Sequence, residues 1–201
     1  MTKSMYALNL DPLAVSILDF WFGPRHSPAH GMERDVWFRK DAAFDAEIRM
    51  RFGEATAIAL AGGYGEWCAT AEGALARVLL LDQFTRNIHR DTPAAFAGDA
   101  RALATASDAI ERGLDRALDP HGRWFLYLPF EHAEDHAAQQ RSLALFGALA
   151  EETGLAAPLE WAKKHAEVVA RFGRYPHRNS ILGRTSTPEE LAFLDQPGSR
   201  F

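Results

Sequence analysis

Residues 41–62 read DAAFDAEIRMRFGEATAIALAG and show most plainly which class of fold the chain adopts. Asp41 can accept a hydrogen bond from a free N–H group in the first turn of a helix, so we expect it to be an N-cap. Behind it, Phe44, Ile48 and Phe52 recur at every fourth position, which places them on one face of an α-helix. The stretch therefore predicts an amphipathic helix whose apolar face packs into a core.

The composition of the whole chain also favours helices. Its 201 residues include 35 Ala and 22 Leu, but only 5 Val and 6 Ile. Ala and Leu favour helices, whereas β-branched residues are enriched in strands. The composition predicts an all-α fold.

Proline directly after a capping side chain marks three further helix starts. The capping residues are Asp11, Thr92 and Thr187, each of which directly precedes a proline. Glu190 completes a capping box with Thr187. With the apolar periodicity, these signals predict helices over residues 12–22, 42–61, 71–84, 93–112, 121–128, 130–152, 158–172 and 188–194.

The sequence shows no internal division. No Pro/Ser-rich linker, charge block or low-complexity tract interrupts it, so we expect one domain over residues 1–201 with antiparallel helices and short connections. An Arg-Asn pair followed by a Thr-Pro helix start occurs twice, from Arg86 and from Arg178. This echo suggests a stacked helical array.

The net charge and the single cysteine exclude several classes of function. Lys and Arg number 22 against 27 Asp and Glu, giving a formal charge of −5, so we expect no nucleic-acid partner. Cys68 alone cannot form an intrachain disulfide, which is typical of a reducing compartment. We expect no signal peptide and no membrane span, because no apolar run reaches the roughly 18 residues that cross a bilayer. These features predict a cytoplasmic protein.

Three short segments combine apolar residues with dense polar groups. They are residues 79–90 (LLLDQFTRNIHR), 124–136 (WFLYLPFEHAEDH) and 171–179 (RFGRYPHRN). Charged side chains beside apolar runs must be paired or face a cavity, so these segments are the candidates for a functional site.

With DFWFG at residues 19–23, these segments resemble the bacterial family known as domain of unknown function 924 over nearly the whole chain. The resemblance implies a helical fold similar to tetratricopeptide-repeat arrays, and it implies no established reaction. We therefore expect a right-handed stack of about eight to nine antiparallel helices. His136 and Tyr175 depart from the residues that the family's strings lead us to expect at these places.

The cationic and amide side chains of the three segments predict a site for a small anionic ligand. Guanidinium groups bind carboxylate or phosphate with two parallel hydrogen bonds and stay charged when partly desolvated. The alternative is a buried network in which acids of these segments neutralise the arginines, and the two interpretations can coexist. The predicted ligand-binding residues are Asp82, Arg86, Asn87, Arg171, Arg174, Arg178 and Asn179.

Proton transfer in such a site is predicted for His132, assisted by Glu131 or Glu134, and for His177. Imidazole titrates closest to neutral pH, and a carboxylate can hold one of its tautomers. The motifs GxSxG, GxxxxGK and GxGxxG do not occur, so the sequence leaves open whether the protein is an enzyme and which cofactor it uses.

We assign no metal ligands from the sequence. His132 and His136 have the spacing that two imidazoles on one helix face use to bind a metal, but the intervening residues do not make an HExxH motif. A solvated, ion-paired surface is the commoner meaning of such a pattern. We interpret the Lys-Lys-His165 run likewise as a solvated helix face, and large aromatic residues, Phe38 and Trp161 included, as core.

Two functions from different classes follow from these observations. The first is a small-ligand binder or enzyme, in which the three segments meet at one concave pocket. The second is an interaction module, in which successive helices present a wider groove to a peptide or a partner protein. We favour the pocket, because polar residues of unlike chemistry cluster in short runs and do not recur once per helical pair. The sequence does not predict an oligomeric state.

Overall fold

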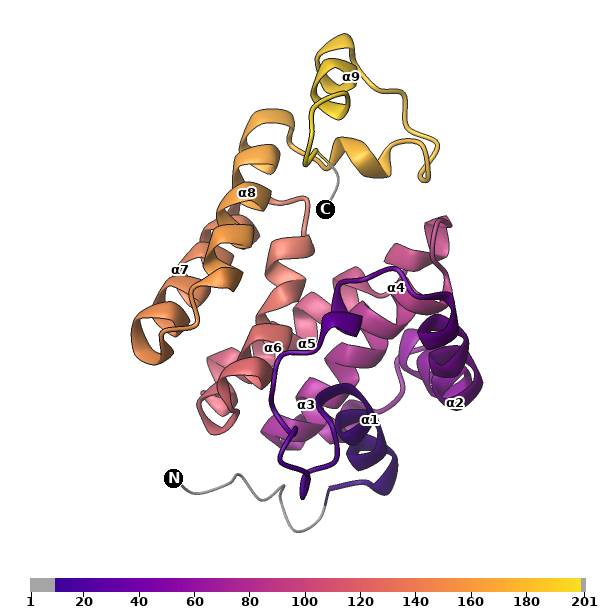
Figure 1. The fold of residues 1–201 in the computed structure, drawn as a ribbon, viewed down its shortest axis with the longest axis vertical. Helices are drawn as coiled ribbons and strands as arrows, with labels where there is room; N and C mark the ends of the chain where they lie inside the picture. Colours follow the sequence, from indigo (N-terminus) through magenta and orange to yellow (C-terminus); the bar gives the residue numbers. More distant parts are fainter. Residues whose placement is uncertain (1–9, 200–201) are drawn as a thin grey trace. The chain divides into compact units, whose positions relative to one another are not determined.

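The computed structural model of the protein describes residues 10–199, and within that range it contains helices and no strand (Figure 1). The prediction of an all-α fold is confirmed. The described chain forms two compact units, which we call unit 1 (residues 10–90 and 94–129) and unit 2 (residues 91–93 and 130–199). A tetratricopeptide-like stack in one domain stays a prediction. No helix in the described range is long and apolar enough to cross a membrane.

The first helices of unit 1 start at capping residues, of which Asp11 and Asp41 were predicted above. Asp11, Asp41 and Thr70 each accept hydrogen bonds from N–H groups in the first turn of the helix that follows. The helices of this unit are α1 (Pro12–Phe22), α2 (Ala42–Leu60), α3 (Ala71–Val78), α4 (Thr85–Ile88), α5 (Asp99–Glu111) and most of α6 (Pro120–His132).

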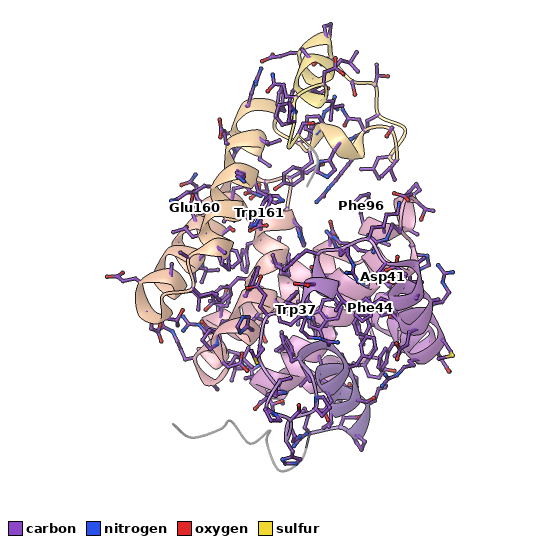
Figure 2. The ribbon with its side chains drawn as sticks, in the orientation of Figure 1. Trp37, Asp41, Phe44, Phe96, Glu160 and Trp161 are labelled. Carbon is purple, nitrogen blue, oxygen red and sulfur yellow. The ribbon has the colours of Figure 1, made fainter. Side chains whose placement is uncertain are left out.

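Aromatic side chains from distant parts of the sequence form the core of unit 1. The fully buried Trp21 lies with its ring centroid 6.3 Å from that of Trp37 and 5.9 Å from that of Phe44, both labelled in Figure 2. Trp37 also donates an indole hydrogen bond of 2.9 Å to the Trp21 carbonyl. Two predicted core residues are in fact exposed: Phe38 (56%), which stacks on Trp124, and Trp161 (47%), whose ring lies under the Lys164 ammonium group.

A π-helical segment, η3 (Leu79–Phe84), joins α3 to α4 and was not predicted. All six of its residues are buried, and the Thr85 hydroxyl donates to the Leu80 carbonyl five residues earlier at 2.9 Å. Helical structure therefore continues to Ile88, beyond the predicted end at residue 84.

The backbone of Gly98 packs directly against η3. A Cβ atom at this position would lie 2.0 Å from the Leu81 carbonyl oxygen. The helix predicted over residues 93–112 is wrong at its start. The segment Pro93–Phe96 is a 3-10 turn, and α5 begins only at Asp99, after this close contact.

Helix α6 continues through Pro129, where we predicted a break. It ends at His132, and α7 (His136–Thr153) begins after Asp135, whose carboxylate caps the Ala138 N–H at 2.8 Å. The side chain of Gln139 donates to the Glu131 and Ala133 carbonyls, each at 2.8 Å. These carbonyls have no partner within the helix. Gln139 therefore stabilises the end of α6 at His132, whereas the sequence pattern predicted that the helix ends before Pro129.

Unit 2 is built on the helix pair α7 and α8 (Ala157–Phe172), which lie side by side (Figure 1). Gly154 and Gly173 end these helices with φ of 78° and 69°, a conformation that favours glycine. A 3-10 turn, η6 (Pro176–Arg178), then leads to α9 (Pro188–Leu194), whose predicted capping box is present.

Candidate functional site

The predicted site residues lie in both units, and we describe each unit by itself. Unit 1 holds a cluster on η3 and α4, and unit 2 holds a cluster at the end of α6 and around η6. The first contains Asp82, Arg86 and Asn87, and the second contains Glu131, His132, Glu134, Arg171, Arg174, His177, Arg178 and Asn179.

In unit 1, the fully buried Asp82 is an ion-pair partner. Arg86 Nη1 lies 2.9 Å from an oxygen of Asp82 and 2.9 Å from an oxygen of Asp99. The Gln83 side chain also donates to Asp82. Here the charge network that we considered as an alternative to a ligand site is present.

Asn87 belongs to a second pairing in unit 1. Its amide donates to Asp45 at 2.7 Å, and Arg90 binds the same carboxylate with Nε at 2.7 Å and Nη2 at 2.8 Å. Burial acts to raise the pKa of Asp45, but the hydrogen bonds from Arg90 and Asn87 outweigh it and lower that pKa below its usual value. These contacts tie α2 to α4.

In unit 2, Arg171 and Arg174 pair with the first turn of α9. Arg174 binds both oxygens of Glu190, at 2.6 and 2.9 Å, and this contact lowers the pKa of Glu190 to about 2. Arg171 binds Glu189 at 2.9 Å and lines a hollow of about 200 Å³ with Phe172. Both guanidinium groups thus connect the end of α8 and the turn after it to α9.

A second bidentate pair holds the turn that follows α8. Arg184 donates to both oxygens of Glu134, at 2.6 and 2.8 Å, and its Nε donates to Asn179 at 2.9 Å. Glu134 also accepts the Tyr175 N–H at 2.7 Å. Partial burial acts to raise the pKa of Glu134, but these hydrogen bonds outweigh it and lower that pKa.

Tyr175, at the start of this turn, is fully buried, and its ring contacts both Arg178 and His177. The guanidinium carbon of Arg178 lies 4.5 Å from the centre of its ring, and the centroid of the His177 ring lies 5.6 Å away. Arg178 is only 7% exposed, while His177 is half-buried. Burial lowers the pKa of His177 to about 4, and the charge of Arg178 acts in the same direction.

His165 completes the cluster from α8, which corrects our interpretation of the Lys-Lys-His165 run. The residue is 6% exposed, because this position of α8 faces the end of α6. Its Nδ1 lies 3.2 Å from Glu131 and 2.9 Å from the Trp161 carbonyl, and its ring contacts that of Tyr175 at 5.5 Å. Burial lowers the pKa of His165 to about 3, so the ring that lies against Glu131 is a neutral imidazole.

His132, the last residue of α6, lies with its ring centroid 6.5 Å from that of His165. The expectation that His132 and His136 share one helix face is wrong, because a helix end and the Asp135 cap separate them. In residues 10–199, no group of three His, Cys, Asp or Glu side chains is arranged to hold a metal ion.

Sequence reasoning missed three residues that shape this cluster. His165 follows two lysines, and its burial depends on which face of α8 meets α6. Arg184 stood out only as part of the repeated Arg-Asn and Thr-Pro pattern, and Glu190 only as a capping residue. The i, i+4 spacing of Trp161 and His165 was the one available signal, because it predicts that an imidazole nitrogen can reach a helix carbonyl.

Comparisons with known proteins agree with the family resemblance found in the sequence. The family model described as bacterial protein of unknown function (DUF924) matches residues 17–198. The solved structure of a protein of unknown function from Agrobacterium tumefaciens is 45% identical and superposes with a TM-score of 0.81, covering 91% of this chain and 97% of that one. No curated protein matches the chain.

Proposed function

The chain belongs to the bacterial family of unknown function DUF924, whose description names no activity, and from the site itself we propose that unit 2 binds a small oxyanion at Arg178. The ligand is a carboxylate or a phosphate group. A guanidinium group recognises either one through a planar pair of hydrogen bonds.

The observation that carries this proposal is the environment of Arg178. Its guanidinium is almost fully buried and stacks on the ring of Tyr175, which holds its plane in one orientation. Two imidazoles, those of His165 and His177, lie close enough for its charge to lower their pKa values. A guanidinium held in one plane presents its donors to an oxyanion in a fixed arrangement.

Two acidic groups of the cluster form bidentate pairs with other arginines. Glu134 binds Arg184 through both oxygens, and Glu190 binds Arg174 through both oxygens. In this proposal Glu134 is a positioning residue, because it holds the Tyr175 N–H and not the ligand.

His132 and His177 are half-buried residues of the same unit. In this proposal they donate hydrogen bonds to the anion and exchange protons with it. Asp82, Arg86 and Asn87 do not enter the proposal, because their contacts stabilise unit 1.

The experiment is a thermal-shift titration with inorganic phosphate and with acetate. By linkage, a ligand that binds only the folded state raises Tm as its concentration rises. We expect Arg178→Gln to lose the shift that the wild type shows. Arg141→Gln removes the same charge from an exposed position on α7 and should keep it.

Because salts also stabilise proteins non-specifically, the difference between the two variants is the measured quantity. If Arg178→Gln fails to fold, Arg178→Lys keeps the charge without the planar fork and should weaken the shift. Equal shifts in the wild type and in a folded Arg178 variant would overturn the proposal.

A further inference from the structure

The hollow of about 200 Å³ in unit 2 lies against one face of α8. Phe193 on α9 and Gly198 after it line the same hollow. Cavities of about 150 Å³ bind a benzene ring, so this hollow has room for one aromatic or large aliphatic group. The residues that α8 contributes recur at helical spacing and are Lys164, Glu167, Val168, Arg171 and Phe172.

The apolar part of this lining belongs to the hydrophobic cluster of unit 2. Val168 is buried in that cluster, and Phe172 and Phe193 pack against it with their ring centroids 5.1 Å apart. Both rings are only half-buried, and both line the hollow. An apolar group in the hollow would cover these rings and remove their remaining surface from water.

Two exposed side chains of opposite charge line the same hollow. Lys164 and Glu167 are three positions apart on α8, so they are neighbours on the helix surface. The Lys164 ammonium nitrogen lies 4.2 Å from the centre of the Trp161 ring. The hollow thus has a cation and a carboxylate side by side at its edge.

The third charged side chain of the lining, Arg171, is paired with Glu189. Its Nε and Nη2 donate to one oxygen of Glu189 at 3.0 and 2.9 Å, and its guanidinium carbon lies 4.7 Å from the centre of the Phe172 ring. This pair carries no net charge. The charges that the hollow presents to a ligand are therefore those of Lys164 and Glu167.

We propose that this hollow binds a free amino acid with an aromatic or large aliphatic side chain. Such a molecule carries one negative and one positive group next to an apolar group, as the lining requires. Its α-carboxylate binds Lys164, its α-ammonium group binds Glu167, and its side chain packs against Phe172 and Phe193. Arg178 does not line the hollow, so this site does not depend on the oxyanion site.

The test is an NMR titration of the ¹⁵N-labelled full chain with L-phenylalanine and three related molecules. Phenylpropanoate lacks the ammonium group, phenylethylamine lacks the carboxylate, and L-alanine keeps both charges without the ring. We expect L-phenylalanine to shift the Gly198 amide resonance with a Kd on the order of 1 mM. Each singly charged analogue should bind about two- to fivefold more weakly, because it loses one exposed ion pair. L-Alanine should bind at least about tenfold more weakly.

Exposed charge variants assign the two ion pairs. Lys164→Gln should bring L-phenylalanine to the affinity of phenylethylamine, and Glu167→Gln should bring it to the affinity of phenylpropanoate. Lys163→Gln is the matched control, because Lys163 is also exposed and pairs with Glu160 at 2.7 Å. It should keep the wild-type order of affinities.

Several results would overturn the proposal. Equal affinity of L-phenylalanine and both analogues in the wild type would show that the charges are not recognised. Equal affinity of L-phenylalanine and phenylpropanoate alone would identify the ligand as an apolar carboxylate instead of an amino acid. An unshifted Gly198 resonance at saturating solubility of L-phenylalanine would exclude binding in this hollow.

Discussion

The contact between Arg184 and Glu134 shows how single side chains fix the candidate site. Glu134 accepts two hydrogen bonds from Arg184 and one from the Tyr175 N–H, and both charged side chains are 24% exposed. A pair in this setting is less screened than a surface pair, and it also satisfies a backbone donor. The orientation of the turn that carries Tyr175 and Arg178 therefore depends on it.

We expect Glu134→Gln to lower the free energy of unfolding by about 1–2 kcal/mol, because the amide can replace only part of these charged hydrogen bonds. Urea denaturation measures the change. The matched control is Glu47→Gln, which breaks the exposed pair with Arg51 and should change stability by less than about 0.5 kcal/mol. Equal losses in the two variants would contradict the prediction.

At this scale the sequence did not predict which partners the charged side chains have. Arg174 and Arg178 were both assigned to ligand binding, yet Arg174 binds Glu190, sixteen positions along the chain, while Arg178 stacks on Tyr175. Local spacing does not predict that Arg174 meets Glu190, because this acid lies on another helix. His165 was missed for the same reason.

At the scale of elements, helices with local start signals were predicted well. The ranges predicted for α1 and α9 agree with the structure, because a capping side chain and a proline define each start within a few residues. The end of α6 was not predicted, since it depends on Gln139 from α7. The π-helical segment η3 was missed for a similar reason, because its backbone packs against Gly98.

Replacing Gly98 tests the close packing of η3. In Gly98→Ala, the new Cβ would lie 2.0 Å from the Leu81 carbonyl oxygen, so the backbone must move. We expect a loss of at least about 1–3 kcal/mol in the free energy of unfolding, measured with urea. Gly147→Ala on α7 meets no atom within 4 Å and should stabilise the protein by about 0.5–1 kcal/mol. Stability gained by both variants would refute the close contact.

Replacing Gln139 tests how α6 ends. Gln139→Leu removes the side-chain donor to the carbonyls of Glu131 and Ala133, although the Tyr175 hydroxyl still donates to Glu131, and the change should cost about 1–3 kcal/mol. Hydrogen exchange at the last turn of α6 should become faster. The neighbouring Gln140→Leu changes an exposed side chain and serves as the control. Unchanged exchange in Gln139→Leu would show that this end is held by other contacts.

At the scale of the whole molecule, the buried His165 and the half-buried His177 of unit 2 make stability depend on pH. The pKa of His165 is lowered to about 3 and that of His177 to about 4, mainly by burial, from the usual value of 6.5. Below pH 6.5 the unfolded chain takes up protons at these sites that the folded chain does not. Stability must therefore fall as the pH is lowered from 6.5 toward the folded-state pKa values.

Each such histidine contributes a slope of at most about 1.4 kcal/mol per pH unit, so His165 alone should cost roughly 2 kcal/mol between pH 6.5 and 5. The paired carboxylates act at lower pH, because the pKa values of Glu134 and Glu190 are lowered from the usual value of 4.5. Urea denaturation at a series of pH values measures the slope. His165→Phe should flatten it, whereas His136→Gln, which changes an exposed side chain, should not. A slope in His165→Phe equal to that of the wild type would mean that protonation of His165 does not differ between the folded and unfolded states.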